Sequence, residues 1–185
     1  CGSKHPDPEF AQLRVLQGVF ETAAAGLTKV EVDFVTTNGE CTMPDCELRE
    51  VMSWCMWYDY FSVPQPAAEA EPGRFQPELA SAIASLPAYV ERCRHFIVLV
   101  PAVRHESGCL LDYHTWRSRA WCRFERLARV MRGDGSVLIV HRTDAITEMC
   151  AQMYLFEPVG VGELSCEEDR PRLAESVRIL FEQKA

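Results

Sequence analysis

Two short apolar runs constrain the fold of this chain more than any other feature of its sequence. Residues 95–100, HFIVLV, are almost continuously apolar and end at Pro101, and residues 137–140, VLIV, repeat the pattern. Such runs are typical of strands in parallel sheets that are covered on both faces, because neither face then requires polar side chains. We therefore expect the two runs to be neighbouring strands, central in one sheet and buried on both faces.

Further strand-like segments alternate with amphipathic helical stripes along the chain. The predicted strands are residues 29–37, 56–63, 95–100, 137–140 and 154–156. The predicted helices carry apolar stripes that begin at Phe10, Leu48, Leu79, Ala120, Ile146 and Leu173. We expect Pro87 to break or kink the third helix. Strands that alternate with helices predict a parallel sheet, because parallel neighbours need crossover connections. The expected fold is therefore an α/β, flavodoxin-like three-layer fold, with a five-stranded parallel sheet and helices on both faces.

The length of 185 residues fits a single domain. We expect an extra N-terminal helix within residues 1–28 and an alternating strand and helix core over residues 29–185. Residues 66–75, PAAEAEPGRF, have loop chemistry and are expected to form the most mobile segment. The chain begins with Cys1, so we expect it to be a domain of something longer.

The composition excludes several classes of protein. A formal net charge of −8 argues against non-specific nucleic-acid binding, which requires a cationic surface. Nine cysteines without dense, regular spacing favour reduced thiols and a cytoplasmic location. No run approaches the roughly 18 apolar residues of a membrane-spanning helix. Phosphate-binding loops, dinucleotide fingerprints, serine nucleophile elbows and zinc-protease helices have no counterpart in the sequence.

Residues 77–131 resemble the middle of a Toll/interleukin-1 receptor (TIR) domain. The matching segments are PELASAI, HFIVLV and SRAWCRFERL, and the last carries the family pattern at Ser118, Trp121, Cys122 and Glu125. Residues 59–66 are also similar to segments of the TIR-like fungal heterokaryon-incompatibility domains. The resemblance implies one of two activities. Catalytic members cleave NAD with the glutamate of this helix, whereas others are adaptors that act through homotypic self-association.

The expected site lies at the carboxyl ends of the strands, where open α/β sheets bind ligands. On a helix over residues 118–131, Glu125 shares one flank with Trp121 and Ser118. The resemblance implies that Glu125 is catalytic, while Trp121, Ser118 and Asp59 would contact substrate. Two simpler readings stay open: Glu125 could be a solvated partner of Arg129 four residues on, and Asp59 could cap a turn.

Other candidate residues have simpler interpretations. Trp121 and Cys122 are expected to pack in the core, and Cys122 has no histidine at a spacing that suggests a nucleophile. A stripe of arginines opposite the core is expected to be a solvated face; it consists of Arg119, Arg123 and Arg126. Two groups of possible zinc ligands, Cys41 with Cys46 and His105 with Cys109 and His114, lack the spacing of a structural site. No metal or cofactor is therefore expected.

The sequence leaves two functions open. The first is hydrolysis of NAD to nicotinamide and ADP-ribose products in signalling or cell death. Glu125 would then stabilise the positive charge that develops on the ribose. The second is a non-catalytic module for homotypic protein–protein interaction. NAD is the expected substrate in the first case, and a second copy of the chain is the expected partner in both.

Overall fold

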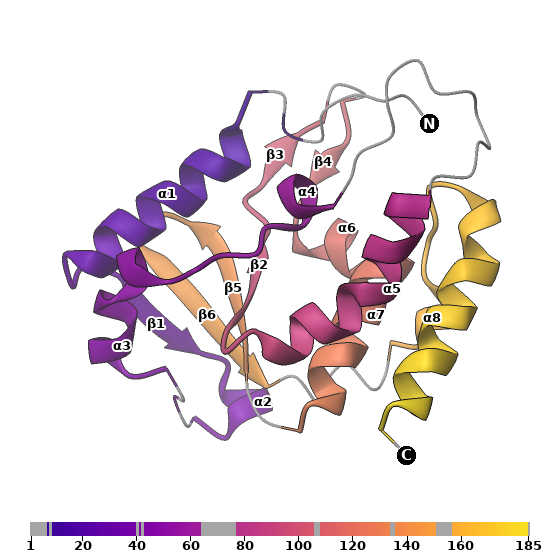
Figure 1. Cartoon of the computed structure of the whole chain (residues 1–185). Helices are drawn as coiled ribbons and strands as arrows, with labels where there is room; N and C mark the ends of the chain where they lie inside the picture. Colours follow the sequence, from indigo (N-terminus) through magenta and orange to yellow (C-terminus); the bar gives the residue numbers. More distant parts are fainter. Residues whose placement is uncertain are drawn as a thin grey trace.

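A mixed four-stranded sheet lies at the centre of the structure (Figure 1). The computed structural model describes residues 7, 9–39, 41, 43–63, 77–105, 108–133, 136–150 and 157–184. In these residues the strand order is β1-β6-β5-β2. The strands are β1 (Lys29–Val32), β2 (Phe96–Leu99), β5 (Ser136–Arg142) and β6 (Ala145–Cys150).

The two apolar runs form adjacent parallel strands, as expected. In the register of β2 and β5, Phe96 pairs with Val137 and Val98 with Ile139. The residues of β5 from Val137 to Val140 are fully buried, because this strand has a neighbour on each side. The expectation that both runs are central is wrong for β2, which is an edge strand of the described sheet.

The segment after β5 is a strand and not the helix predicted from Ile146 onward. A two-residue turn at Thr143 and Asp144 returns the chain directly, so β6 pairs antiparallel with β5. Over so short a segment the apolar residues fit the spacing of a helix, but they also fit a strand, in which Ile146 and Glu148 lie on one buried face. The prediction of an all-parallel sheet is therefore wrong, although β1 pairs parallel with β6.

Two other predicted strands differ in the structure. The first stops at Val32, because the Asp33 carboxylate accepts the Val35 N–H and starts the short helix α2 (Phe34–Thr37). Residues 56–63 contain the short helix α4 (Asp59–Ser62) in place of a strand. The fifth predicted strand, residues 154–156, and the predicted mobile loop, residues 66–75, lie outside the described residues.

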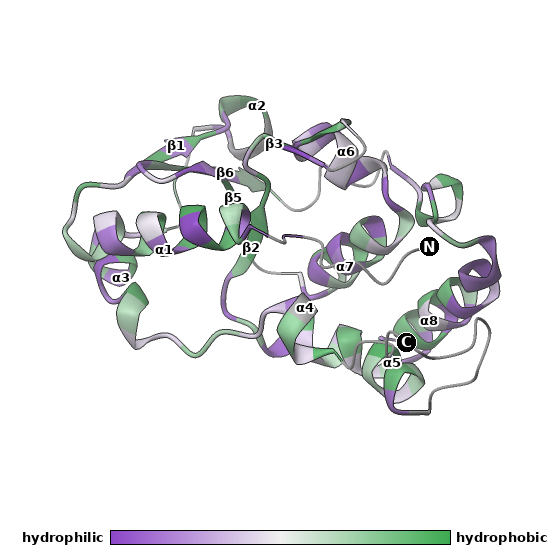
Figure 2. Ribbon diagram, turned by 90° about the horizontal axis from the view of Figure 1, so that it is seen from above, coloured by the Kyte–Doolittle hydropathy of each residue, from purple (hydrophilic) through white to green (hydrophobic). Residues whose placement is uncertain are grey.

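Helices cover both faces of the sheet. On one face, α1 (Ala11–Ala24) and α3 (Asp45–Arg49) pack with the alternate residues Leu138, Val140 and Ile146. On the other face, the intervening residues meet Tyr113 and Trp116 of α6 (Tyr113–Ser118) and Val130 of α7 (Ala120–Met131). Figure 2 shows α1 and α6 on opposite sides of the strands. The predicted N-terminal helix is thus a layer of the core.

A second apolar cluster lies beside the β2 edge of the sheet. It joins α7 to α5 (Pro77–Arg92) and α8 (Arg170–Glu182), with Phe124 fully buried at its centre (Figures 1 and 2). Helix α5 runs through Pro87 without the interruption expected there. None of the helices in the described ranges has the length and apolar character needed to cross a membrane.

The connection from β2 to α7, expected to be a loop, has regular structure of its own. It contains the small hairpin of β3 (Val103–Arg104) and β4 (Leu110–Leu111), followed by α6. Three single turns of 3-10 helix complete the described elements: η1 (Val51–Ser53), η3 (Val159–Val161) and η4 (Glu167–Asp169). The hairpin and α6 build one wall of the cavity described next.

Candidate functional site

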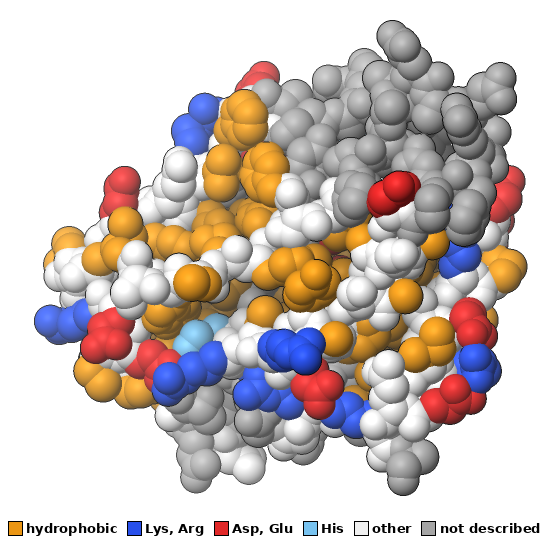
Figure 3. Space-filling view, viewed as in Figure 1, with side chains coloured by type: hydrophobic (Ala, Val, Ile, Leu, Met, Phe, Trp, Pro, Cys, Tyr) orange, Lys and Arg blue, Asp and Glu red, His pale blue; other side chains and the backbone are white. Residues whose placement is uncertain are grey.

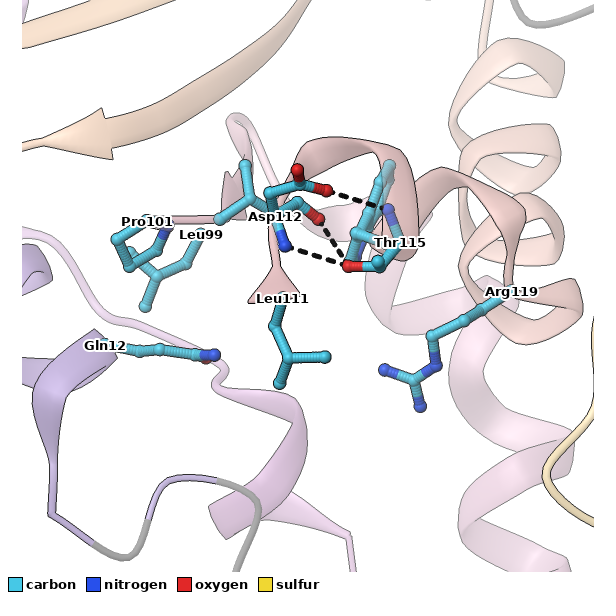
Figure 4. Close-up of a pocket in the computed structure, with 9 residues that line it drawn as sticks. Gln12, Leu99, Pro101, Leu111, Asp112, Thr115 and Arg119 are labelled. Carbon is cyan, nitrogen blue, oxygen red and sulfur yellow. Dashed lines mark hydrogen bonds between the residues drawn. The ribbon is translucent and has the colours of Figure 1, made fainter. Parts of the chain in front are cut away.

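A cavity of about 110 Å³ lies beyond the carboxyl end of β2, at the edge of the sheet where the sequence places the site. Its floor is apolar, and its polar residues come from α1 and from the segment around α6 (Figure 4). The lining residues are Gln12, Leu99, Val100, Pro101, Leu111, Asp112, Thr115, Trp116 and Arg119.

A capping box at the start of α6 fixes the aromatic wall of this cavity. Asp112 Oδ1 accepts the Thr115 N–H at 3.0 Å, and Thr115 Oγ1 accepts the Asp112 N–H at 2.8 Å. The cap orients Trp116, which stacks on Tyr113 and lies under the Arg126 guanidinium, 5.6 Å from its ring centre. Sequence analysis missed Trp116, although the Asp-x-x-Thr spacing before it was a signal for a helix start.

Arg119 is held at the junction between α6 and α7. A strand-like bridge pairs it with Glu163: the Ala120 N–H donates to the Glu163 carbonyl, and the Glu163 N–H donates to the Ser118 carbonyl, both at 2.8 Å. A side chain at Gly162 would place its Cβ 2.5 Å from Ala120 Cα, so only glycine permits this approach. The bridge fixes the backbone from which Arg119 reaches the cavity.

Two carboxylates share the neighbourhood of Arg119. Desolvation, and then the negative charge of Asp59, raise the pKa of Glu125 to about 8, and Arg119 opposes this rise. Desolvation also raises the pKa of Asp59, again opposed by Arg119. Glu125 keeps part of its surface accessible, and Asp59 is exposed at the start of α4. The structure thus brings together two predicted site residues from segments 66 positions apart, with an arginine that was assigned to another role.

The other predicted site residues, Trp121 and Ser118, make contacts within the fold, and Cys122 is buried as expected. Trp121 packs edge-on against Phe124 and belongs to the cluster between α7, α5 and α8. The Ser118 hydroxyl donates to the Thr115 carbonyl at 3.0 Å and to Glu163 Oε2 at 3.1 Å, which stabilises the α6–α7 junction. Cys122 is buried, and desolvation raises its pKa to about 12, so its thiol is not a nucleophile at neutral pH.

The predicted solvated arginine face is wrong for Arg126, although Arg119 is exposed as expected. Arg126 is fully buried and donates to Glu157 Oε2 at 2.6 Å, while Arg123 donates to the carbonyl oxygens of Arg117 and Pro158. The chain after residue 156 returns across this side of α7 and supplies Glu157 to Arg126 and the Pro158 carbonyl to Arg123. The proposed partner of Glu125, Arg129, is buried and donates to the carbonyls of Cys93 and Arg94 at 2.9 Å.

The two cysteine and histidine groups considered for zinc do not assemble a ligand set. Within the described ranges, no three His, Cys, Asp or Glu side chains are arranged to hold a metal ion. The thiol of Cys41 instead lies beside the buried Glu148 carboxylate, which also accepts the Met43 N–H. The candidate site therefore consists of Glu125, Asp59 and Arg119, together with the cavity that Arg119 lines.

Comparison with family models, curated proteins and solved structures gave no match to this chain. The geometry of the site is therefore the basis for proposing a function.

The pKa of Glu125 makes the stability of the fold depend on pH. Because the folded pKa of about 8 exceeds the ordinary value of 4.5, the native state holds this proton more tightly than the unfolded state. The stabilisation is complete below pH 4.5 and is lost as pH rises through 8. We expect Glu125→Gln, which cannot ionise, to be more stable than the parent above pH 8 by a few kcal/mol, on the order set by 1.4 kcal/mol per pKa unit.

Urea denaturation at pH 5, 7 and 9 measures this difference. The matched control is Glu21→Gln, at an exposed position of α1, which is expected to follow the parent at each pH. An unchanged difference in stability between Glu125→Gln and the parent from pH 5 to pH 9 would contradict the assignment.

Proposed function

We propose that this chain is a flavodoxin-like domain of the TIR type and that its site cleaves the N-glycosidic bond of NAD. The observation that carries the proposal is the interaction of Glu125, whose pKa is raised by desolvation, with Asp59 and with Arg119, which lines the cavity at the carboxyl end of β2. A carboxylate whose pKa is raised by desolvation and by a neighbouring charge is more common at catalytic sites than elsewhere. In its ionised form such a carboxylate would suit a cationic substrate, and the pyridinium ring of NAD supplies one.

The reaction needs few groups from the protein. The bond between ribose C1′ and the pyridinium nitrogen breaks, its electron pair neutralises the ring, and nicotinamide leaves. Positive charge then develops on the ribose, and water adds to C1′ and releases a proton. An ionised Glu125 would stabilise this charge, as carboxylates do in glycoside hydrolysis. Asp59 would contact the ribose or orient the water.

The same pKa predicts how the activity depends on pH. In the free protein Glu125 is mostly protonated at neutral pH, and only its ionised form can stabilise a cation. We therefore expect kcat/KM for NAD to rise about tenfold per pH unit at low pH and to level off near pH 8. A profile that falls between pH 6 and 8 would contradict this role.

Substitution of Glu125 tests the proposal directly. Glu125→Gln conserves shape and removes only the charge, so nicotinamide release is expected to fall by about 10²- to 10³-fold. The measurement is chromatography of nicotinamide from NAD at high protein concentration, with Glu21→Gln as the matched control that retains parental activity. Cleavage by Glu125→Gln at the parental rate would refute the assignment.

One observation favours the alternative of a homotypic interaction module. Met52, Met56 and Phe61 are more than half exposed along the segment from η1 to α4. Figure 3 shows hydrophobic side chains gathered across the middle of this face, with charged side chains along its lower edge. An exposed apolar patch on a protein surface commonly marks a contact with another protein. Self-association without nicotinamide release at any concentration would favour this function over catalysis.

A further inference from the structure

The edge of the sheet at β1 is open to a further strand. In the described sheet β1 has β6 as its one neighbour, and it lies at the opposite end of the sheet from α7 and α8 (Figures 1 and 2). The N–H groups of Lys29 and Asp33 donate to the carbonyl oxygens of Asp144 and Glu148, at 3.1 and 3.0 Å. Alternate residues of a strand bond to opposite sides, so the backbone groups of the residues between them face outward.

The outward-facing residues of β1 are Val30 and Val32. In the described part of the chain, their N–H and carbonyl groups make no hydrogen bond. A row of such groups on an edge strand is a template for pairing with another strand. What pairs there depends on the side chains that β1 presents.

The charges on β1 are complementary to themselves in one register. Lys29 and Glu31 are exposed on one face of the strand, whereas Val30 and Val32 point to the other face. When two copies pair antiparallel with Val30 opposite Val30, Lys29 of each copy lies opposite Glu31 of the other. A register shifted by two residues would instead place Lys29 opposite Lys29 or Glu31 opposite Glu31, and like charges in such pairs repel.

The present contacts of Lys29 and Glu31 leave this pairing possible. A lysine on an edge strand ordinarily discourages pairing, but here the glutamate two residues on offsets its charge in one register. Glu31 Oε1 accepts from the Arg142 guanidinium at 3.1 Å, and both side chains are more than half exposed. Such an exposed ion pair is weak, so Glu31 remains available to Lys29 of a second copy.

Apolar side chains at both ends of β1 would be covered by the same pairing. Leu27, just before the strand, is 70% exposed, and Phe34 and Val35, just after it, are 74% and 80% exposed. An antiparallel pair brings the start of one strand to the end of the other, so Leu27 of one copy approaches Phe34 and Val35 of the second. Their burial adds to the backbone pairing, which is weak over four residues alone.

We propose that two copies of this chain associate through antiparallel pairing of their β1 edges, with Val30 on the two-fold axis, so that their sheets become one continuous sheet. The interface is isologous, since each copy contributes the same residues. The inference does not rest on the proposed function, and it uses a different surface from the exposed residues between η1 and α4. The cavity at the carboxyl end of β2 lies outside this interface.

Sedimentation velocity of the whole chain, from micromolar to near-millimolar concentration, tests the proposal. We expect a weak, reversible dimer. Lys29→Glu and Glu31→Lys should each weaken it about tenfold or more, because both symmetry-related pairs become like-charge pairs. The double variant Lys29→Glu with Glu31→Lys exchanges the charges and should restore dimerisation to within a few fold of the parent.

Two further variants separate edge pairing from general effects of charge. Arg14→Glu makes the same change in net charge at an exposed position of α1, and it should dimerise as the parent does. Val30→Pro removes an N–H that β6 does not use, so it should keep the fold by circular dichroism and abolish the dimer. If Val30→Pro does not fold, the charge variants still decide the question.

Amide hydrogen exchange locates the contact. Protection of the Val30 and Val32 N–H groups should rise with protein concentration in the parent and stay low in Lys29→Glu. A chain that stays monomeric at every concentration, a dimer that Lys29→Glu leaves unchanged, or a double variant that fails to recover would overturn the proposal. Protection that appears between Met52 and Phe61 while β1 stays unprotected would also overturn it. Nicotinamide release bears on none of these outcomes, so this proposal and the proposed function can fail separately.

Discussion

Replacing Val98 with aspartate is expected to unfold the protein. Val98 is only 2% exposed, and it lies in β2 opposite Ile139, packed with Val100 and Val137 against α6. An unpaired carboxylate at this position would cost several kcal/mol, which is comparable to the whole stability of a domain of this size. Although β2 is an edge strand, the Val98 side chain itself is covered, so the edge gives the aspartate no access to water.

Two further variants serve as controls for this prediction. Val161→Asp introduces the same carboxylate at a valine that is 73% exposed, and it should leave the fold intact. Val98→Thr keeps the shape and adds one hydroxyl, so it should destabilise the fold by about 1–3 kcal/mol without unfolding it. Circular dichroism and urea denaturation measure all three. A soluble Val98→Asp variant that unfolds cooperatively would mean that β2 is wrongly placed.

Replacing Glu157 with alanine is expected to destabilise the fold by about 3–5 kcal/mol. Glu157 binds the fully buried Arg126 through one oxygen, and the other accepts the Nε–H of Arg117 at 2.6 Å. Loss of the carboxylate leaves the buried Arg126 guanidinium without this counter-charge. The desolvation of that charge is then the main cause of the lost stability. The guanidinium also lies over Trp116, so the cavity wall should loosen as well.

The partners of Glu157 provide the controls. Arg117 has a side chain that is 40% exposed, and Arg117→Ala should cost about 1 kcal/mol or less because water replaces the ion pair. The double variant Arg126→Met with Glu157→Leu removes both buried charges and should recover most of the stability lost in Glu157→Ala. Thermal denaturation compares the four proteins. Equal losses in Glu157→Ala and Arg117→Ala would show that the buried pair does not behave as assigned.

The elements of the chain that depend on local signals were predictable. A continuous apolar run predicts β2 and β5 whatever elements lie beside them. An apolar stripe at helical spacing predicts α1, α5, α7 and α8. Ambiguous segments were not predictable. The apolar residues of segment 145–150 fit the spacing of a helix and of a strand equally well. The segment is a strand because the tight turn before it places it along the edge of β5 that β2 does not occupy. Likewise Asp33 ends β1 early through a side-chain contact that no periodicity reports.

The sequence by itself determined an α/β fold and the pairing of the two apolar runs, and it predicted a site at the carboxyl ends of the strands that includes Glu125. The tertiary structure alone decided which charged residues meet. Asp59 and Glu125 are 66 positions apart, and Arg126 is buried only because Glu157 folds back over α7. The spacing of apolar residues, which predicts helices and strands, is set within a few residues of the chain. Burial, pKa values and ion pairs depend instead on groups that the fold brings together from distant parts of the chain.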